Sequence, residues 1–252
     1  MDTKEALFES CLRLGDTSLI LGHRISEWCG HGPILEEDIA MTNISLDLIG
    51  QARIILSYAG EVEGKGRSED HLAYLRDALD YRNVLLAEQE NGDFGTTTVR
   101  HFLFDVYHYY FLQDLCKSKD ERLSGYAEKA LKEVTYHLRH SSEWVIRLGD
   151  GTEESKSRVQ ESLDDLWMYT GELFEMDEVD LHLIEKGIVP DLTLIKTKWE
   201  IKVSEILAKA KLIQPESGWM QSGGKKGLHG ELLGYILAEL QFVQRAYPNS
   251  EW

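Results

Sequence analysis

The sequence is poor in residues that break helices and in residues that cross-link chains. Its 252 residues include only four prolines and three cysteines. An odd number of cysteines without paired spacing excludes a disulfide framework and a zinc site, so we expect reduced and mostly buried thiols. Basic residues are also scarce, because 27 Lys and Arg stand against 44 Asp and Glu, for a net charge of −17. This charge argues against DNA, RNA and anionic membranes as partners, since their phosphates would repel the chain.

Long apolar runs and targeting signals are missing as well. No uninterrupted apolar run approaches the roughly 20 residues that a transmembrane helix needs. The first ten residues, MDTKEALFES, contain three acidic residues and no apolar core, so we expect no signal peptide. The sequence therefore predicts a soluble, cytoplasmic protein that does not bind a membrane.

Helical periodicity fills the long stretches between the prolines. No sustained two-residue alternation indicates a β-strand. Gly50 lies inside an expected helix, where glycine costs up to about 1 kcal/mol relative to alanine, so we expect a closely packed neighbour there. Without a linker, these helices predict an all-α fold, a four-helix bundle with additional helices, in a single domain over residues 1–252. The expected helices cover residues 8–28, 35–59, 71–88, 96–116 (capped by one of the threonines 96–98), 121–148, 158–175, 192–212 and 231–246.

Bundles of this size often hold a di-iron centre, and the sequence carries its layout without its ligands. Such a centre takes a lone carboxylate from each of two helices and a Glu-x-x-His pair from each of the other two. Leucine and valine stand at the two glutamate positions and cannot bind iron, and a glutamine amide is a poor, neutral ligand. The sequence therefore predicts the remnant of a metal site with no metal in this chain. The six positions are Asp16, Leu48 and Gln51 in one half-site and Asp105, Val134 and His137 in the other.

A shifted register offers a weaker alternative for metal binding. Asp47 then pairs with Gln51, and Glu133 with His137, each at a spacing of four residues. The second pair could hold one metal ion, while the first half-site still lacks ligands. Without a metal, buried carboxylates need another positive partner, for which a protonated His137, an arginine such as Arg53, or a lysine is a candidate.

Two further groups of residues stand out. Residues 222–229 (SGGKKGLH) lack the spacing of a nucleotide-binding loop, yet two lysines in a glycine-rich loop before a helix can hold an anion. Gly223, Gly224, Lys225 and Lys226 are therefore candidates for contact with coenzyme A phosphates or with an acidic partner surface. The alternative is a flexible, solvated connection. His101 and His108 lie among aromatic residues, a pattern typical of a core or an interface.

Five stretches of the sequence are similar to the C subunits of bacterial phenylacetyl-CoA epoxidases, also called ring-1,2-phenylacetyl-CoA oxygenases. They are LRLGDTSLILGHRISEWCGHGP (12–33), NISLDLIGQAR (43–53), YHLRHSSEWVIRLGDGTEES (136–155), LWMYTGELF (166–174) and GGKKGLHGELLGYILAELQFVQRAYP (223–248). The resemblance covers nearly the whole chain. It implies a ferritin-like fold without a di-iron centre and pairing with a homologous A subunit that carries one. It also implies a separate reductase subunit with NADPH, flavin and iron–sulfur groups, acting in aerobic phenylacetate breakdown.

The sequence and the resemblance together predict a non-catalytic structural subunit of this multisubunit oxygenase. Its expected partners are the catalytic A subunit and the other subunits of the complex, or a second copy of itself when it is isolated. Two alternatives stay open at this point. One is a self-sufficient di-iron oxygenase, and the other is a module that binds an acyl-CoA.

Overall fold

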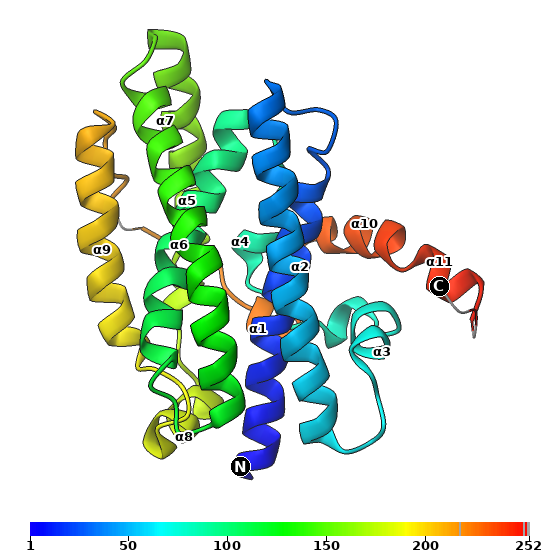
Figure 1. The fold of residues 1–252 in the computed structure, drawn as a ribbon. Helices are drawn as coiled ribbons and strands as arrows, with labels where there is room; N and C mark the ends of the chain where they lie inside the picture. The colour runs from blue at the N-terminus through cyan, green and yellow to red at the C-terminus, as the bar shows by residue number, and fades with distance from the viewer. Residues whose placement is uncertain (217, 249, 251–252) are drawn as a thin grey trace. The chain divides into compact units, whose positions relative to one another are not determined.

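The computed structural model describes the chain except for residues 217, 249, 251 and 252. The described residues form eleven α-helices and three short 3₁₀ helices, and no β-strand (Figure 1). The all-α prediction is confirmed. The helices group into two compact units: unit 1 comprises Met1–Glu90, Glu178–Leu183 and the described part of Ser222–Trp252, and unit 2 comprises Asn91–Asp177 and Ile184–Gln221. The single domain over residues 1–252 stays a prediction.

Unit 1 is built on two long helices, α1 (Thr3–Ser26) and α2 (Leu35–Glu63), which pack side by side (Figure 1). Both were expected from their apolar periodicity. The N-terminal end of α2 is stabilised by three acidic residues in its first turn, which lie at the positive end of the helix dipole. Its C-terminal end is closed by Gly64 in the left-handed conformation, at φ 71°.

Glycines on α1, not the glycine inside α2, bring these two helices together. A Cβ atom on Gly15 would lie 2.7 Å from Cδ2 of Leu56, and Ser45 Oγ donates a hydrogen bond of 2.8 Å to the carbonyl of Gly22. By contrast, a Cβ atom on Gly50 would meet nothing within 4 Å. The expected close neighbour of Gly50 is therefore wrong, because that position faces open space.

Helix α2 is strongly apolar although charged residues interrupt its sequence. It is the single helix of the described residues that is long and apolar enough to cross a membrane by length and composition. One face of it, including Ile44, Leu48 and Ile55, is buried in unit 1. Burial against α1 accounts for the apolar character of this face, as in the core helix of any water-soluble protein.

The chain between α2 and unit 2 is not the single helix predicted over residues 71–88. It forms α3 (Glu69–Tyr74), a 3₁₀ turn η1 (Ala78–Asp80) and α4 (Leu85–Glu88). The leucines had helical spacing, but Leu79 is 74% exposed, so they do not form one buried face. Arg76 and Tyr81 turn inward instead, which requires a non-helical backbone between the short helices.

The C-terminal part of unit 1 forms two helices where the sequence predicted one. Helix α10 (Glu231–Leu240) and helix α11 (Phe242–Ala246) replace the predicted helix 231–246, and they extend away from the α1–α2 pair (Figure 1). The chain breaks at Gln241, whose buried amide donates hydrogen bonds to the carbonyls of Ala73 and Arg76 at 3.2 and 3.0 Å. This long-range pairing holds the side chain inward at the break.

Unit 2 contains α5 (Phe94–Leu115), α6 (Glu121–Gly149), α7 (Glu153–Trp167), the 3₁₀ turn η2 (Gly171–Phe174) and α9 (Leu192–Lys209). Helix α5 packs against α6, α7 and α9. Its cap is not one of the threonines, because the carboxylate of Asp93 accepts the Thr96 N–H at 2.9 Å. Thr152 caps α7, which therefore begins earlier than the predicted residue 158.

Helix α8 (Glu178–Lys186) was not predicted, since nine residues are too few to show a sustained helical period. All three cysteines are free, as expected. Cys11 is buried and Cys116 half-buried, but Cys29 is exposed, so the expectation of mostly buried thiols is wrong for Cys29.

Candidate functional site

In unit 1, the three positions of the first half-site are all buried. Asp16 lies on α1 with no exposed surface, and Leu48 and Gln51 lie on α2. The Leu48 side chain offers no donor atom to a metal. The burial of Asp16 makes its charge costly unless a positive group is within hydrogen-bonding distance.

The positive group is Arg76, which the sequence did not indicate. Its Nη1 atom donates to Asp16 Oδ2 at 3.0 Å, and its Nη2 atom donates to Oδ1, so the pair is bidentate. The backbone N–H of Arg82 donates to the same Oδ2 at 2.9 Å. Arg53, the arginine expected in this role, is exposed and pairs with Glu69 at 3.5 Å. That expectation is wrong, because the side chain of Arg53 points to solvent.

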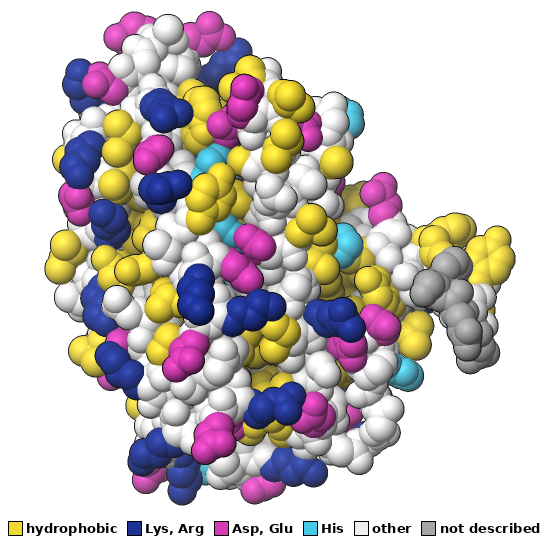
Figure 2. All heavy atoms as spheres, in the orientation of Figure 1, with side chains coloured by type: hydrophobic (Ala, Val, Ile, Leu, Met, Phe, Trp, Pro, Cys, Tyr) yellow, Lys and Arg dark blue, Asp and Glu magenta, His cyan; other side chains and the backbone are white. Residues whose placement is uncertain are grey.

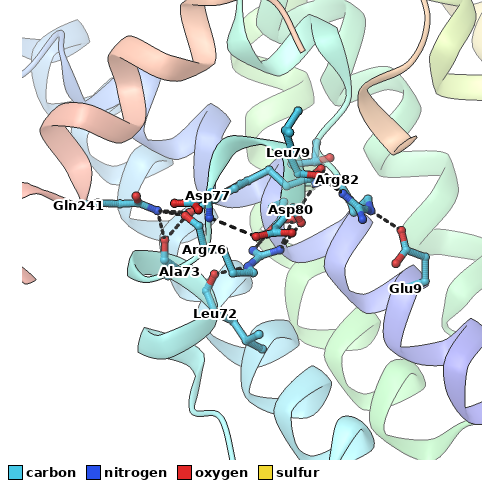
Figure 3. Close-up of polar contacts among 12 residues, drawn as sticks. Glu9, Leu72, Ala73, Arg76, Asp77, Leu79, Asp80, Arg82 and Gln241 are labelled. Atoms are coloured by element: carbon cyan, nitrogen blue, oxygen red, sulfur yellow. Dashed lines mark hydrogen bonds and ion pairs between the residues drawn. The ribbon is translucent and has the colours of Figure 1, made fainter. Parts of the chain in front are cut away.

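Arg76 is itself held firmly in place (Figure 3). Its guanidinium donates to the carbonyls of Leu72 and Asp80 and lies 4.4 Å from the centre of the Tyr81 ring. Burial lowers the pKa of Arg76, but the Asp16 carboxylate outweighs it and the pKa stands above its usual value. The arginine therefore stays charged, and both oxygens of the Asp16 carboxylate already have hydrogen-bond donors.

In unit 2, the second half-site is buried just as completely. Asp105 lies on α5, and Val134 and His137 lie on α6. Ser141, one turn after His137, donates a hydrogen bond of 2.8 Å to Asp105 Oδ2. Burial raises the pKa of Asp105 to about 6, and the nearby His137 and the Ser141 hydrogen bond offset only part of this rise. Asp105 thus binds a proton far more readily than an exposed aspartate.

Two more histidines of α5 surround this carboxylate on the same helix face. His101 and His108 are both buried, as are Phe102, Phe104 and Tyr107 beside them, while Tyr109 and Tyr110 are half-buried. Burial, with a smaller effect of His137, lowers the pKa of His108 to about 3. Burial also lowers the pKa of His101, helped by the charge of Arg100. These two rings are therefore neutral at physiological pH.

The donor set does not fit a di-iron centre. Each half-site has an apolar side chain where a bridging glutamate is needed, and Asp16 is already neutralised by Arg76. In the shifted register, Asp47 and Glu133 are not buried in the bundle. Among the described residues, no group of three or more His, Cys, Asp or Glu side chains is placed to hold a metal ion. The residues present at these two half-sites therefore do not form the ligand set of a di-iron centre.

The glycine-rich segment is packed onto unit 1. Its residues Gly224–Lys226 form the 3₁₀ turn η3, and Gly227 adopts φ 79° beside the carbonyl of Leu79, where a Cβ atom would be 2.3 Å from that oxygen. The side chain of Lys225 is buried and Lys226 is exposed. Gly223 and Gly224 are buried too. Of the four residues proposed for contact with an anion or a partner, only Lys226 is directly accessible.

The helix start behind this segment is occupied by a carboxylate of the chain itself. Glu88 Oε1 accepts the backbone N–H of Gly230, the N-cap residue of α10, at 2.8 Å. Its Oε2 atom lies 2.9 Å from His229 Nδ1 and accepts from Asn83 at 3.0 Å. A helix N-terminus that already binds a glutamate is not open to a phosphate. Sequence reasoning missed Glu88, because only the fold brings it to His229.

The comparisons with known proteins agree with the motifs that carried the resemblance. The chain matches the family described as phenylacetic acid catabolic protein over residues 1–252. The C subunit of the 1,2-phenylacetyl-CoA epoxidase of Escherichia coli (strain K12) is 46% identical to it over 241 residues, which cover 96% of this chain and 97% of that relative. The resemblance drawn from the sequence is confirmed, and this chain belongs to the phenylacetic acid catabolic protein family, with the helical, ferritin-like fold of its members.

Proposed function

We propose that this chain is a non-catalytic, structural subunit of a cytoplasmic phenylacetyl-CoA epoxidase in phenylacetate catabolism. The observation that carries the proposal is the bidentate pairing of Asp16 with Arg76, which puts a guanidinium where a metal-binding carboxylate would need a metal. Leu48 and Val134, both buried, support it, because neither side chain can ligate iron. The curated relative is named as the C subunit of such an epoxidase. The di-iron centre then belongs to the homologous catalytic subunit, and the electrons come from a reductase subunit.

An exposed apolar surface on unit 1 supports a role in subunit pairing. Leu35, Ile39 and Leu46 lie on the outer face of α2 and are each more than half exposed. Gly50, on the same helix, leaves room for close approach of another helix. Figure 2 shows further hydrophobic side chains gathered over the C-terminal helices, where Tyr235 and Phe242 are exposed. Permanent complexes bury roughly 2,000–5,000 Å² of such surface.

Metal analysis of the purified chain tests the non-catalytic role. We expect far less than one iron per chain after expression in iron-rich medium, and no turnover of phenylacetyl-CoA by the chain alone. The variant Arg76→Ala provides a useful comparison, because removing the guanidinium frees Asp16 without adding the missing glutamates. Close to two irons per wild-type chain, with ligands on α1, α2, α5 and α6, would refute the proposal and favour a self-sufficient oxygenase.

Co-purification with the catalytic subunit tests the structural role. We expect Leu46→Glu on the outer face of α2 to weaken the complex, because it brings a charge into an apolar contact. Leu194→Glu on α9, where the leucine is 61% exposed, is the matched control and should leave assembly unchanged. A wild-type chain that stays apart from the catalytic subunit, as a monomer or a homodimer, would contradict the proposal.

Calorimetry with phenylacetyl-CoA distinguishes an acyl-CoA-binding module from a structural subunit. We expect no heat of binding to the isolated chain. If the complex contacts coenzyme A through residues 222–229, Lys226→Glu should raise the apparent KM while leaving the fold intact, because this side chain is exposed. Lys225→Glu is a poorer probe, since the side chain is buried and its reversal would disturb the loop. Tight binding to the isolated chain would favour the module.

A further inference from the structure

A buried histidine in unit 1 has an oxygen acceptor on both sides of its ring. Nδ1 of His229 lies 2.9 Å from Glu88 Oε2, and Nε2 lies 3.0 Å from the backbone carbonyl oxygen of Tyr81. The histidine side chain is only 4% exposed and the glutamate side chain 1%. A carbonyl oxygen can only accept a hydrogen bond, so Nε2 must carry a proton.

The second nitrogen then determines the charge of the pair. If Nδ1 had no proton, its lone pair would face an ionised carboxylate at 2.9 Å, which is repulsive. A proton must therefore lie between Nδ1 and Oε2. Whether it is bonded to the ring or to the carboxyl group, the pair holds one proton more than a neutral imidazole beside an ionised glutamate.

This pair sits where the C-terminal helices are attached to the rest of unit 1. Gly230, the next residue, donates its N–H to the other oxygen of Glu88, and α10 begins directly afterwards. The helices themselves bury little, because α10 has three buried side chains and α11 has none. The other polar attachments lie farther along, at Gln241 and Arg245 (Figure 3 shows Gln241). Gln241 bonds to the carbonyls of Ala73 and Arg76 and to the Tyr81 hydroxyl, and Arg245 bonds to the carbonyls of Tyr74 and Arg76 and to Asp77. Because the pair is the polar attachment at the start of α10, losing it should loosen the helices from that end.

The two arginines nearest to the pair each have an acidic partner of their own. We therefore expect the net charge of this cluster to change with pH mainly through the proton shared by His229 and Glu88. Arg82 donates to the same Tyr81 carbonyl as His229 and is paired with Glu9. Arg24 donates to the backbone carbonyl of Glu88 and is paired with Glu27. Further charged or titratable groups on the packed segments include Arg13, Asp16, His23, Arg76, Asp77, Asp80, Tyr81, Lys225, Lys226, Glu231 and Glu239.

We propose that the His229–Glu88 pair is a proton-operated latch on the C-terminal helices. With the shared proton in place, both ring nitrogens are hydrogen-bonded and α10 and α11 are held against unit 1. When the pH rises and the proton leaves to solvent, one of the two contacts becomes a repulsion between lone pairs, and the helices loosen. The latch is therefore closed at low pH and opens at high pH. This inference does not depend on the proposed function.

Hydrogen exchange of the full chain, read by mass spectrometry at pH 6 and pH 9 and corrected for intrinsic exchange rates, tests the latch. A hydrogen bond to a charged group is strong enough to change local protection by about tenfold or more. We expect peptides from residues 231–246 to lose about tenfold more protection between these pH values than peptides from α6. In His229→Gln the same peptides should be weakly protected at both pH values. Equal changes in both sets of peptides of the wild-type chain would overturn the proposal.

A second histidine variant and an NMR measurement on the wild-type protein show whether the pH response comes from His229. His31→Gln changes an exposed histidine of the same unit and should keep the pH response of the wild-type chain. If it removes that response as fully as His229→Gln does, the latch is refuted. Nitrogen NMR of wild-type protein labelled in its histidines needs no variant to fold. At pH 6 we expect a proton at both ring nitrogens of His229 or shared with Glu88, and an unprotonated Nδ1 far from any shared proton would also overturn the proposal.

Discussion

Replacing Asp105 by asparagine should stabilise the protein, and increasingly so as the pH rises. Burial raises the pKa of this carboxyl group from its ordinary 3.8 to about 6. The native state thus holds the proton more tightly than the unfolded chain, so the stability from this group is fully present below pH 3.8. It is lost as the pH rises through about 6. The full difference corresponds to about 3 kcal/mol, since each pKa unit is worth about 1.4 kcal/mol. An asparagine at this position avoids the cost and can still accept the hydrogen bond from Ser141.

Urea unfolding of both proteins, followed by circular dichroism between pH 4 and pH 8, measures this effect. We expect Asp105→Asn to gain about 0.6 kcal/mol at pH 4 and about 3 kcal/mol at pH 8. Asp165→Asn, on the exposed side of α7, is the matched control and should change stability by less than about 0.5 kcal/mol at either pH. A loss of stability in Asp105→Asn at pH 8 would refute the reasoning, because it would show that the ionised carboxylate pairs productively with His137.

Three further substitutions test the packing of unit 1 by the same urea assay. Gly50→Ala should stabilise the isolated chain by about 0.5–1 kcal/mol, because the added methyl meets open space and alanine favours the helix; any loss would show that the position is crowded. Gly60→Ala should cost about 1–3 kcal/mol, since its Cβ atom would lie 2.2 Å from the carbonyl oxygen of Arg67, and an unchanged midpoint would contradict this. Arg76→Ala should cost about 3–5 kcal/mol by leaving Asp16 buried without its partner. The double variant with Asp16→Ala should recover part of that loss, and a simple sum of the two single effects would argue against the pairing.

The sequence predicted the long helices and failed where single polar side chains decide the backbone. Helices α1, α2, α5, α6 and α9 follow from apolar periodicity, because each buries a continuous face. Residues 71–88 had the same periodicity in their leucines, yet Arg76 must reach Asp16 and leaves the helix to do so. Gln241 divides α10 from α11 in the same way, through bonds to carbonyls far away in the sequence. The spacing of apolar residues along the chain gives no information about such long-range hydrogen bonds.

The candidate site was likewise predictable only where it depends on helix periodicity. The burial of Leu48 and Val134 follows from their place on the inner faces of long helices, which apolar periodicity reveals. The partner of Asp16 could not be found from the sequence, since 60 residues separate it from Arg76 and nothing in their spacing links them. The contact between His229 and Glu88 was equally hidden, because it depends on a loop packing against a short helix.

The pairing of Asp16 with Arg76 also changes what the chain needs in order to fold. A carboxylate balanced by iron is neutral only after the ion has been delivered, so a metal-bound bundle depends on the supply of iron in the cell. A guanidinium is synthesised with the polypeptide and keeps its charge at every physiological pH. The buried charge of Asp16 is therefore balanced by the chain itself, in iron-starved cells as well as in replete ones. For the structural subunit proposed above, this would make the balance of the buried charge independent of when a catalytic partner is loaded with metal.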